Sequence, residues 1–343
     1  MMSGVASFEK HNLSASVDEL LAEAERREPF VNPDGRSAAA FERVSIGGRR
    51  HIVKYAHLDD DFMMRVSGDL VCRPVRAWAE GLLDAAPDLV DHTVVGAALG
   101  YGRNGWGAAL LMRDVSDELV ALGNVPFTPD EHELLVDRLA GWCAATWGFR
   151  DDPVTGPHLL RYEARWAWFG QVALDGERAL GFPERVPAIA AEGWERFWAR
   201  APRDIAGVIE ELWRDCTPLA EALQATPSCL LHGDAKASNM GVGADGRMVL
   251  IDWAYVGEGP ACHDLCWHLA LDREKLPVTK EATMEAFRLG LERRGVDTAG
   301  WWDRQLGLCL LGALVLFGWE KGYNDDAELL WWCDAAREGA RFL

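Results

Sequence analysis

Three oxygen-bearing side chains lie close together in the sequence, in two short segments. Asp234 and Asn239 are in the segment 230–239 (LLHGDAKASN), and Asp252 follows the apolar run 248–251 (MVLI). Mg²⁺ takes oxygen ligands and is usually bound by one or two carboxylates together with substrate phosphates. Two of the three side chains could therefore hold the ion, and the remaining carboxylate could accept a proton.

Lys236 places a positive charge two residues after Asp234. A base, two metal ligands and a lysine suit phosphoryl transfer, because that reaction depends more on positioning and charge neutralisation than on covalent help. Gly243 and Gly246 predict a turn that folds the two segments back on each other. The sequence thus predicts that a short hairpin-like insert, 229–255, brings these groups together.

The first third of the sequence predicts a sheet with one helix. Gly47 and Gly48 mark a tight turn between two runs of β type, which predicts a hairpin. Trp78, Leu82 and Leu83 are the apolar positions of a helical pattern. The predicted strands are 40–44, 51–55, 92–98 and 108–112, and the predicted helix is 73–84.

From Thr128 onward the sequence is mostly helical, apart from the insert. Thr128, Pro129 and Glu131 give three agreeing signals for a helix start: an N-cap residue, Pro at the first position and Glu at the third. The near-apolar run 306–319 has 14 residues, too few to span a bilayer, and predicts a buried helix. The predicted domains are a small mixed N-terminal lobe, 1–114, and a large helical C-terminal lobe, 115–343, which together make an α+β fold.

The insert contains a motif that resembles the catalytic sequence of the aminoglycoside phosphotransferase and choline kinase superfamily, His-Gly-Asp-x-x-x-x-Asn followed by Ile-Asp. The Asp-to-Asn offset also matches the catalytic loop of protein kinases. The stretch 112–116 (MRDVS) resembles the hinge of the same superfamily, although Arg113 departs from the usual Leu-Met-Glu-Asp-Leu pattern. The resemblance extends from about Phe41 to Trp332 and implies a two-lobed protein-kinase-like fold. The matching residues are His232, Gly233, Asp234, Asn239, Ile251 and Asp252.

The resemblance implies a role for each matching residue. Asp234 would be the base that orients and deprotonates the acceptor hydroxyl, and Lys236 would supply positive charge beside it. Asn239 and Asp252 would hold Mg²⁺. Lys54, in the second strand of the predicted hairpin, matches the lysine that contacts the α- and β-phosphates of the nucleotide.

Further residues are implied around the nucleotide. The usual acidic partner of Lys54 is a helix glutamate, for which Glu80 is the candidate and Asp69 the second choice. Ser37 would lie in the loop that covers the phosphates, where backbone amides can cradle an anion. The hinge residues implied beside the nucleotide are Met112 and Asp114.

Residues 262–268 (CHDLCWH) allow two interpretations. Asp264 matches an Asp that braces the catalytic loop in many relatives, and His232 would hold the same loop in shape. The thiol and imidazole side chains of this stretch could instead ligate zinc. We favour buried packing, because free Cys is among the most buried residue types. The eight cysteines include no Cys-x-x-Cys pair, which predicts reduced thiols in the cytoplasm rather than a disulfide framework.

Acidic and aromatic side chains also gather near the C-terminus. Relatives often bind cationic or sugar substrates with acids of this lobe, so Glu320, Asp325 and Asp326 are candidate acceptor-binding residues. The alternative is a surface turn beside a core tryptophan pair, and aromatics at helical spacing are usually packing. We favour the surface turn over the acceptor site.

The resemblance implies an ATP-dependent O-phosphotransferase that acts on a small hydroxylated molecule such as an antibiotic, amino sugar, sugar or amino alcohol. GTP remains open as the donor. The alternatives are a non-catalytic nucleotide- or ligand-binding relative and a protein kinase. The second is disfavoured because the sequence has no Gly-x-Gly-x-x-Gly loop and no Ala-Pro-Glu segment in the expected order.

The overall charge bears on the partners. With 35 basic and 54 acidic residues the formal net charge is −19, and no Lys/Arg-rich face is visible. Nucleic acid and anionic membrane surfaces are therefore not expected partners. The N-terminus lacks a basic segment followed by an apolar stretch, so no signal peptide is expected.

Overall fold

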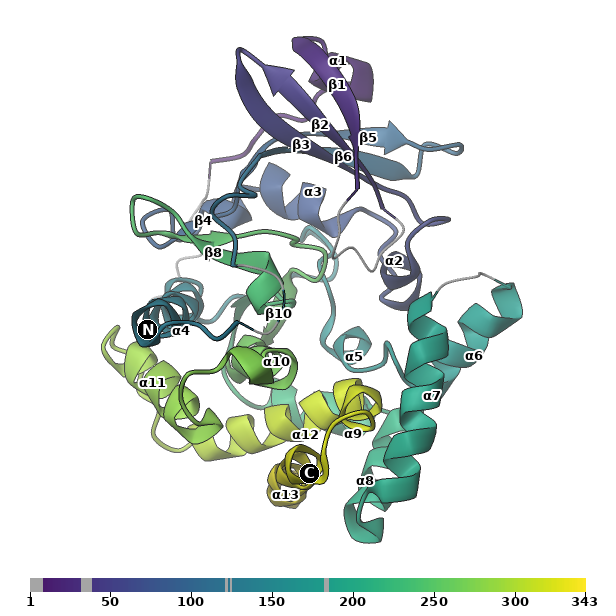
Figure 1. Cartoon of the computed structure of the whole chain (residues 1–343), viewed down its shortest axis with the longest axis vertical. Coiled ribbons are helices and arrows are strands. Elements are labelled where there is room, and N and C mark those ends of the chain that lie inside the picture. The colour runs from purple at the N-terminus through teal and green to yellow at the C-terminus, as the bar shows by residue number, and fades with distance from the viewer. Residues whose placement is uncertain (1–8, 32–38, 121–122, 124, 182–184) are drawn as a thin grey trace.

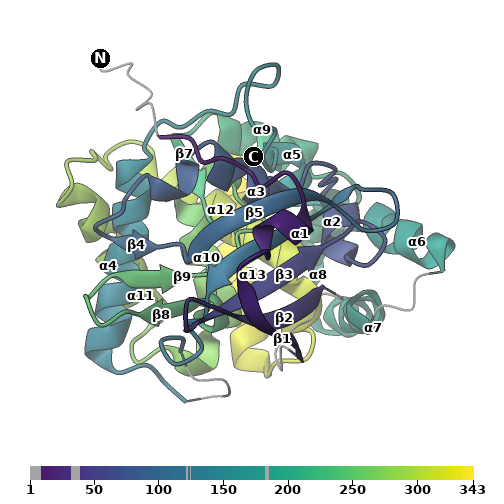
Figure 2. The same cartoon turned by 90° about the horizontal axis from the view of Figure 1, so that it is seen from above.

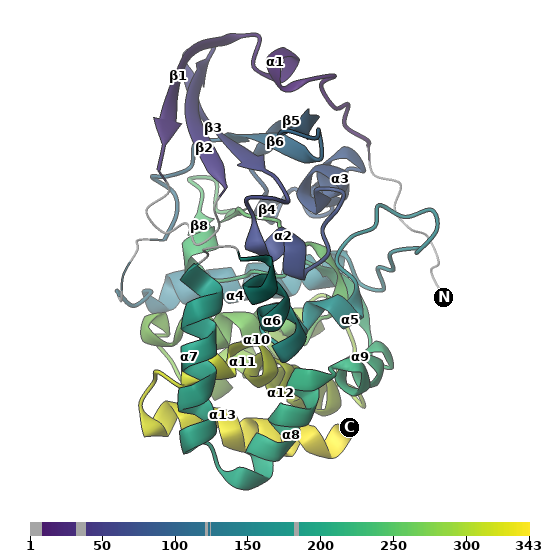
Figure 3. The ribbon, with the colours of Figure 1, turned by 90° about the vertical axis from the view of Figure 1, so that its right-hand side faces the viewer.

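A computed structural model describes residues 9–31, 39–120, 123, 125–181 and 185–343 (Figure 1). A small lobe built on a β-sheet lies above a larger, mainly helical lobe in the front and side views (Figure 1 and Figure 3). The predicted α+β arrangement is confirmed. The predicted boundary at 114/115 stays a prediction, although the last strand of the upper sheet ends at Arg113.

The sheet of the small lobe has five antiparallel strands in the order β1-β2-β3-β6-β5. Gly47 and Gly48 have φ of 55° and 70°, as a two-residue hairpin turn requires, so the predicted hairpin is confirmed. Strand β1 was not predicted, because its sequence AERREPF is mostly charged and lies at the sheet edge. The strands are β1 (Ala24–Phe30), β2 (Ala40–Ile46), β3 (Arg49–Ala56), β5 (Val94–Tyr101) and β6 (Gly107–Arg113).

The helices of the small lobe are short. The predicted helix 73–84 is wrong beyond Ala79, because Gly81 adopts a left-handed conformation (φ 72°) that ends it, and Leu82–Asp84 forms a separate 3₁₀ turn. Asp61 caps the preceding helix by accepting hydrogen bonds from the backbone N–H groups of the first turn. The helices are α1 (Val17–Leu20), α2 (Phe62–Val66) and α3 (Arg73–Ala79).

The predicted interruption of the helical lobe is confirmed as two short pieces of sheet. Strands β8 and β9 form an antiparallel hairpin, and β7 pairs antiparallel with β10. Strand β4, from the N-terminal part of the chain, pairs parallel with β9 and lies beside it in the view from above (Figure 2). The strands are β4 (Val90–Asp91), β7 (Ser228–Leu231), β8 (Met240–Val242), β9 (Met248–Leu250) and β10 (Gly257–Pro260).

The helices of the large lobe pack around a continuous apolar core. The predicted start at Thr128 is confirmed: its hydroxyl and the Glu131 carboxylate cap each other's backbone N–H groups. The predicted buried helix is confirmed as α12 (Trp302–Lys321), which runs through the core. The other helices are α4 (Pro129–Ala145), α5 (Tyr162–Arg165), α6 (Gln171–Leu180), α7 (Arg185–Arg200), α8 (Arg203–Arg214), α9 (Thr217–Gln224), α10 (Cys262–Leu271), α11 (Lys280–Glu292) and α13 (Asp326–Gly339).

None of the described helices combines the length and the apolar character needed to cross a membrane.

Candidate active site

The carboxylate of Asp234 lies at the centre of the loop that follows β7 and is only 3% exposed. Its Oδ2 accepts hydrogen bonds from Lys236 Nζ (2.9 Å) and Asn239 Nδ2 (2.8 Å). Its Oδ1 accepts one from Trp267 Nε1 (2.8 Å). Burial raises the pKa of this carboxyl above its ordinary value, and the neighbouring ammonium of Lys236 opposes that shift. Asp234 is therefore a buried carboxylate whose orientation three side chains fix.

The β8–β9 hairpin brings Asn239 and Asp252 together, as predicted. Met240 pairs with Leu250, and Ile251 N–H donates to the carbonyl of Asn239 (3.0 Å). Asp252 then adopts a left-handed conformation (φ 64°), which is uncommon for residues with a side chain and often marks functional sites. The amide nitrogen of Asn239 is used on Asp234, so its oxygen is the atom left to bind a cation.

Helix α10 holds the loop 232–239 in place. Both oxygens of Asp264 accept backbone N–H groups, from His232 and Gly233, at 2.9 Å each. Asp264 thus braces the loop, in agreement with the prediction. Trp267, three residues after Asp264 on the same face of α10, donates its indole N–H to the carboxylate of Asp234. Asp272, directly after α10, accepts the backbone N–H of Ala237 (2.8 Å).

His232 and Gly233 shape the turn into the loop. The ring of His232 accepts the N–H of Asp234 at Nδ1 (3.2 Å) and donates from Nε2 to the carbonyl of Ile251 (2.9 Å), so it ties the loop to the segment of Asp252. Gly233 has φ of 85°, and a Cβ there would lie 2.3 Å from the carbonyl oxygen of Tyr255. Only glycine fits this position without rearrangement.

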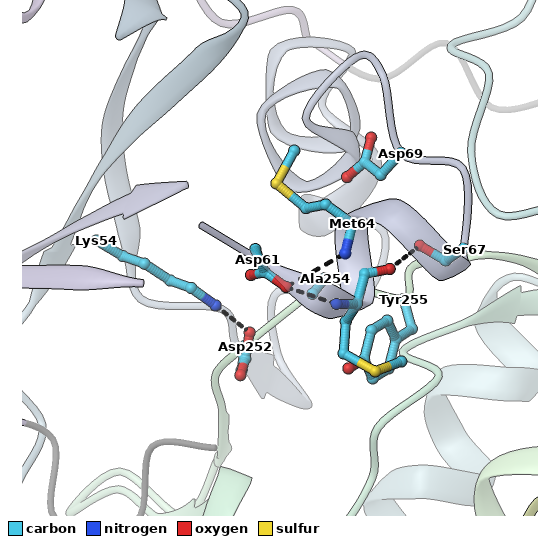
Figure 4. Close-up of a pocket in the computed structure, with 9 residues that line it drawn as sticks. Lys54, Asp61, Met64, Ser67, Asp69, Asp252, Ala254 and Tyr255 are labelled. Atoms are coloured by element: carbon cyan, nitrogen blue, oxygen red, sulfur yellow. Dashed lines mark hydrogen bonds and ion pairs between the residues drawn. The ribbon is translucent and has the colours of Figure 1, made fainter. Parts of the chain in front are cut away.

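Lys54 reaches from β3 into the large lobe and pairs with Asp252 (Nζ to Oδ1, 2.6 Å), as Figure 4 shows. Desolvation works against both charges, yet the lysine pKa is raised and the pKa of Asp252 is lowered, because each charge stabilises the other. The predicted nucleotide lysine and the predicted metal ligand are therefore in direct contact across the two lobes.

The predicted pairing of Lys54 with Glu80 is wrong. Glu80 follows the last residue of α3, and its carboxylate pairs with Lys10 at 2.5 Å. Asp69, the second choice, lines the same pocket as Lys54, but its carboxylate accepts hydrogen bonds from the backbone N–H groups of Val71 and Arg73.

The acid that sequence reasoning missed is Asp61. It is 6% exposed and lines the pocket beside Lys54 and Asp252 (Figure 4). Burial raises its pKa, and the nearby ammonium of Lys54 opposes that shift. Its sequence signal was the position just before the helical run FMMRV, where an Asp is a natural N-cap.

The predicted hinge residues lie at the end of β6. Met112 is half-buried on the strand, and the Asp114 side chain has no exposed surface. Asp114 accepts hydrogen bonds from Arg43 Nε (3.1 Å) and from the hydroxyl of Ser116 (2.6 Å), so it anchors the turn after the strand. Ser37 lies outside the described residues, and its predicted contact with the nucleotide phosphates stays a prediction.

Each of the three C-terminal acids has a local partner. Asp325 accepts the N–H of Glu328 as the N-cap of α13 and pairs with Arg273 (2.5 Å). Asp326 pairs with Arg200 (2.7 Å), and Glu320 pairs with the ammonium of Lys321 (2.7 Å). These contacts agree with a surface turn, and acceptor binding by Glu320, Asp325 and Asp326 stays a prediction.

The cysteines are free thiols in the structure, and Cys262 and Cys266 are buried in α10. Over the described ranges there is no group of three or more His, Cys, Asp or Glu side chains placed to hold a metal ion. The pair Asn239 and Asp252 fits a hard divalent cation by chemistry, because it offers one carboxylate and one amide oxygen and leaves further positions for phosphate oxygens.

Comparisons with known proteins identify the family and the fold. The model of a phosphotransferase enzyme family, APH, matches residues 75–297. Among solved structures, a microcompartment-associated aminopropanol kinase superposes with a TM-score of 0.51 at 12% identity, over 94% of each chain. The choline kinase LicA from Streptococcus pneumoniae gives 0.50 at 11% identity, over 95% of this chain and 96% of that one. LicA in complex with AMP gives 0.50 at 13% identity, over 95% and 98%. No curated protein matches the sequence. The superpositions confirm the two-lobed kinase-like fold.

Proposed function

Because the chain belongs to the APH phosphotransferase enzyme family, we propose that it transfers the γ-phosphate of ATP to a hydroxyl group of a small molecule in the cytoplasm. The observation that carries this proposal is the position of Asp234. It is a buried, hydrogen-bonded carboxylate in the same loop region as a lysine, an amide oxygen and a second carboxylate that contacts the other lobe. That set covers proton acceptance and charge neutralisation, which phosphoryl transfer needs.

In this proposal Asp234 receives the proton of the acceptor hydroxyl. The acceptor oxygen forms a bond to the γ-phosphorus, the bond from that phosphorus to the β–γ bridging oxygen breaks, and ADP leaves. The hydrogen bonds from Trp267 and Asn239 keep the carboxylate aimed while the proton moves. Lys236 offsets negative charge beside the reacting groups, because its ammonium already lies 2.9 Å from Asp234.

Asn239 and Asp252 would hold Mg²⁺, which when bound neutralises phosphate charge. Lys54 would contact the α- and β-phosphates from β3, and the strand end at Met112 and Asp114 would face the nucleotide base. Because a hinge of this kind contacts the base largely through backbone groups, its side chains do not indicate whether the donor is ATP or GTP, so both nucleotides belong in the test.

The acceptor belongs to the small hydroxylated molecules: amino alcohols, amino sugars, sugars and antibiotics. Amino alcohols come first in the test, because the two kinases that superpose with TM-scores of 0.50 and 0.51 are named for choline and aminopropanol. These similarities support testing amino alcohols first, and they identify no particular acceptor.

The proposal is tested in two steps. Thermal unfolding is followed with Mg²⁺ and either ATP or GTP, and transfer of labelled γ-phosphate is then followed across a panel of hydroxylated amines, sugars and antibiotics. We expect a nucleotide-dependent rise in Tm and transfer to one acceptor class. The Asp234→Asn variant should keep the rise in Tm and lose the transfer. No rise in Tm with either nucleotide would overturn the proposal.

The metal assignment has its own test. Asp252→Ala should abolish the part of the nucleotide-induced rise in Tm that depends on Mg²⁺, because the carboxylate ligand is gone. Asp245→Ala, on the exposed turn of the same hairpin, is the matched control and should keep it. If the Mg²⁺-dependent part persists in Asp252→Ala, Asp252 is not the ligand.

A further inference from the structure

Lys54 and a divalent cation make competing demands on Asp252. In the structure the lysine ammonium occupies Oδ1 of Asp252 at 2.6 Å, and the side chain of Lys54 is only 13% exposed. A cation bound by Asp252 would bring a second positive charge against this ammonium. If the cation takes Asp252, this ammonium needs a second carboxylate that holds it in place for the nucleotide phosphates it would contact, because a buried charge without a fixed partner is costly.

Asp61 has the properties of that second counter-ion. Its Oδ1 accepts the N–H groups of Met63 (2.8 Å) and Met64 (3.2 Å), and these are its hydrogen bonds within the described part of the chain. Oδ2 is therefore available on the side of the pocket that Lys54 also lines (Figure 4). In this structure the ion pair of Lys54 is with Asp252.

Contacts in both lobes fix the position of Asp61. As the N-cap it is tied to α2, and Arg65 of the same helix makes a bidentate ion pair with Glu177 of α6 in the large lobe (2.8 Å). Both partners of that pair are nearly buried, with side chains 9% and 5% exposed. Asp69, the other acid of the pocket, has both carboxylate oxygens on backbone N–H groups of the α3 start. Asp61 is therefore the acid with a free oxygen and a fixed position.

We infer that Asp61 is a positioning residue for Lys54: the ammonium exchanges Asp252 for Asp61 when a nucleotide-bound divalent cation takes Asp252. The inference rests on the proposed roles of Lys54 and Asp252 in nucleotide and metal binding. It assigns the acidic partner of Lys54 to the N-cap of α2 in place of a helix glutamate.

The test measures metal binding directly. Mn²⁺ replaces Mg²⁺ as the probe, and its binding in the presence of ATP is followed by the electron paramagnetic resonance signal of free Mn²⁺. In Asp61→Asn the side-chain oxygen still caps α2, but Lys54 has lost its alternative partner and stays on Asp252. We expect Mn²⁺ affinity to fall about tenfold, within the 5–150-fold range typical of coupled sites.

A control variant and a second background separate a positioning role of Asp61 from other effects of the substitution. Asp60→Asn removes the same charge from the exposed neighbouring residue and should change Mn²⁺ affinity less than about twofold. In a Lys54→Met background, Asp61→Asn should have no further effect, because there is no ammonium left to relocate. A general field or folding effect of Asp61 would persist in that background. Asp61→Ser, another N-cap residue, replaces Asp61→Asn if the latter does not fold.

The outcomes are distinct. If wild-type protein binds ATP and Mn²⁺ but Asp61→Asn binds them equally well, or weakens binding equally with and without Lys54, the role of Asp61 is refuted and the proposed function stands. If wild-type protein shows no ATP-dependent Mn²⁺ binding, the proposed function fails and this inference fails with it. A tenfold loss that disappears in the Lys54→Met background supports the exchange.

Discussion

Acidic side chains gather both around the loop 232–239 and at the turn between α12 and α13, and their hydrogen-bond and ion-pair partners differ. At the turn, Asp325 accepts a backbone N–H and an arginine, and these contacts lower its pKa. In the loop, burial raises the pKa of Asp234 although three donors surround it. The acids of the turn are thus satisfied by local structure, whereas Asp234 is held in a less favourable ionised state. Perturbed groups of the second kind are the ones that concentrate at functional sites.

The largest expected effect comes from replacing Asp234, the proposed base. Asp234→Asn should lower turnover about 10²–10⁴-fold, the range for loss of a positioned proton acceptor. The nucleotide Kd should stay close to the wild-type value, because Lys54 and Asp252 are untouched. Steady-state kinetics and nucleotide titration measure both quantities, with Asp245→Asn as the exposed control. Wild-type turnover in Asp234→Asn would remove the base from the mechanism.

The next effect is on stability. Asp264→Ala leaves the buried N–H groups of His232 and Gly233 without their acceptor. An unsatisfied buried group costs about 1–3 kcal/mol, so the free energy of unfolding should fall by about 2–6 kcal/mol. Chemical denaturation measures the loss, and Asp325→Ala provides the contrast, because the Asp325 side chain is itself exposed and its hydrogen bond from the N–H of Glu328 is only partly buried. An equal loss in the two variants would erase the distinction between the regions.

A smaller effect should appear in the pH profile. In the proposed mechanism Asp234 acts as a carboxylate, so activity should fall as the pH drops through its raised pKa. Trp267→Phe removes the hydrogen bond to Oδ1, which stabilises the ionised form, and should raise the pKa further. The acid limb of kcat/KM should therefore move to higher pH by up to about one unit. Trp331→Phe, whose indole donates to the surface residue Glu281, is the control. An unmoved or lowered limb would show that this bond does not tune the base.

The smallest effect is expected at the α12–α13 turn. In the double variant Asp325→Asn/Asp326→Asn, the acceptor KM should change less than about twofold, because both acids already have arginine partners and Asp326 is largely exposed. A rise in acceptor KM at unchanged nucleotide KM would instead show that these acids bind the acceptor. That result would make the turn a second functional region.

Local signals predicted much of the fold and the core of the site. The paired glycines at 47–48, the cap at Thr128 and the motif 232–239 each act within a few residues, so the sequence displays them directly. The hairpin that joins Asn239 to Asp252 also follows from the glycines at 243 and 246. These features depend on backbone conformations that short stretches of sequence determine by themselves.

The acidic partner of Lys54 could not be predicted from such short stretches of sequence. Glu80 fitted a helical pattern, but Gly81 ends α3 one residue later and leaves Glu80 beside Lys10. Asp61 is the last of three consecutive aspartates, and only the packing of α2 against the large lobe distinguishes it from its exposed neighbours. Strand β1 was hidden for a related reason, because edge position rather than alternation defines it.

The β8–β9 hairpin has a consequence for how the sequence can change over evolutionary time. The strand register places Asn239 next to Ile251, and Asp252 follows at once, while the connection between the strands projects outward with Ala244 and Asp245 exposed. Residues inserted between Ala244 and Asp245 would lengthen the loop without shifting that register, and loops of this kind tolerate added length at low entropic cost. The number of residues between Asn239 and Asp252 can therefore change among descendants of this chain. The five-residue spacing from Asp234 to Asn239 has no exposed turn that could take up an insertion, so it should stay constant.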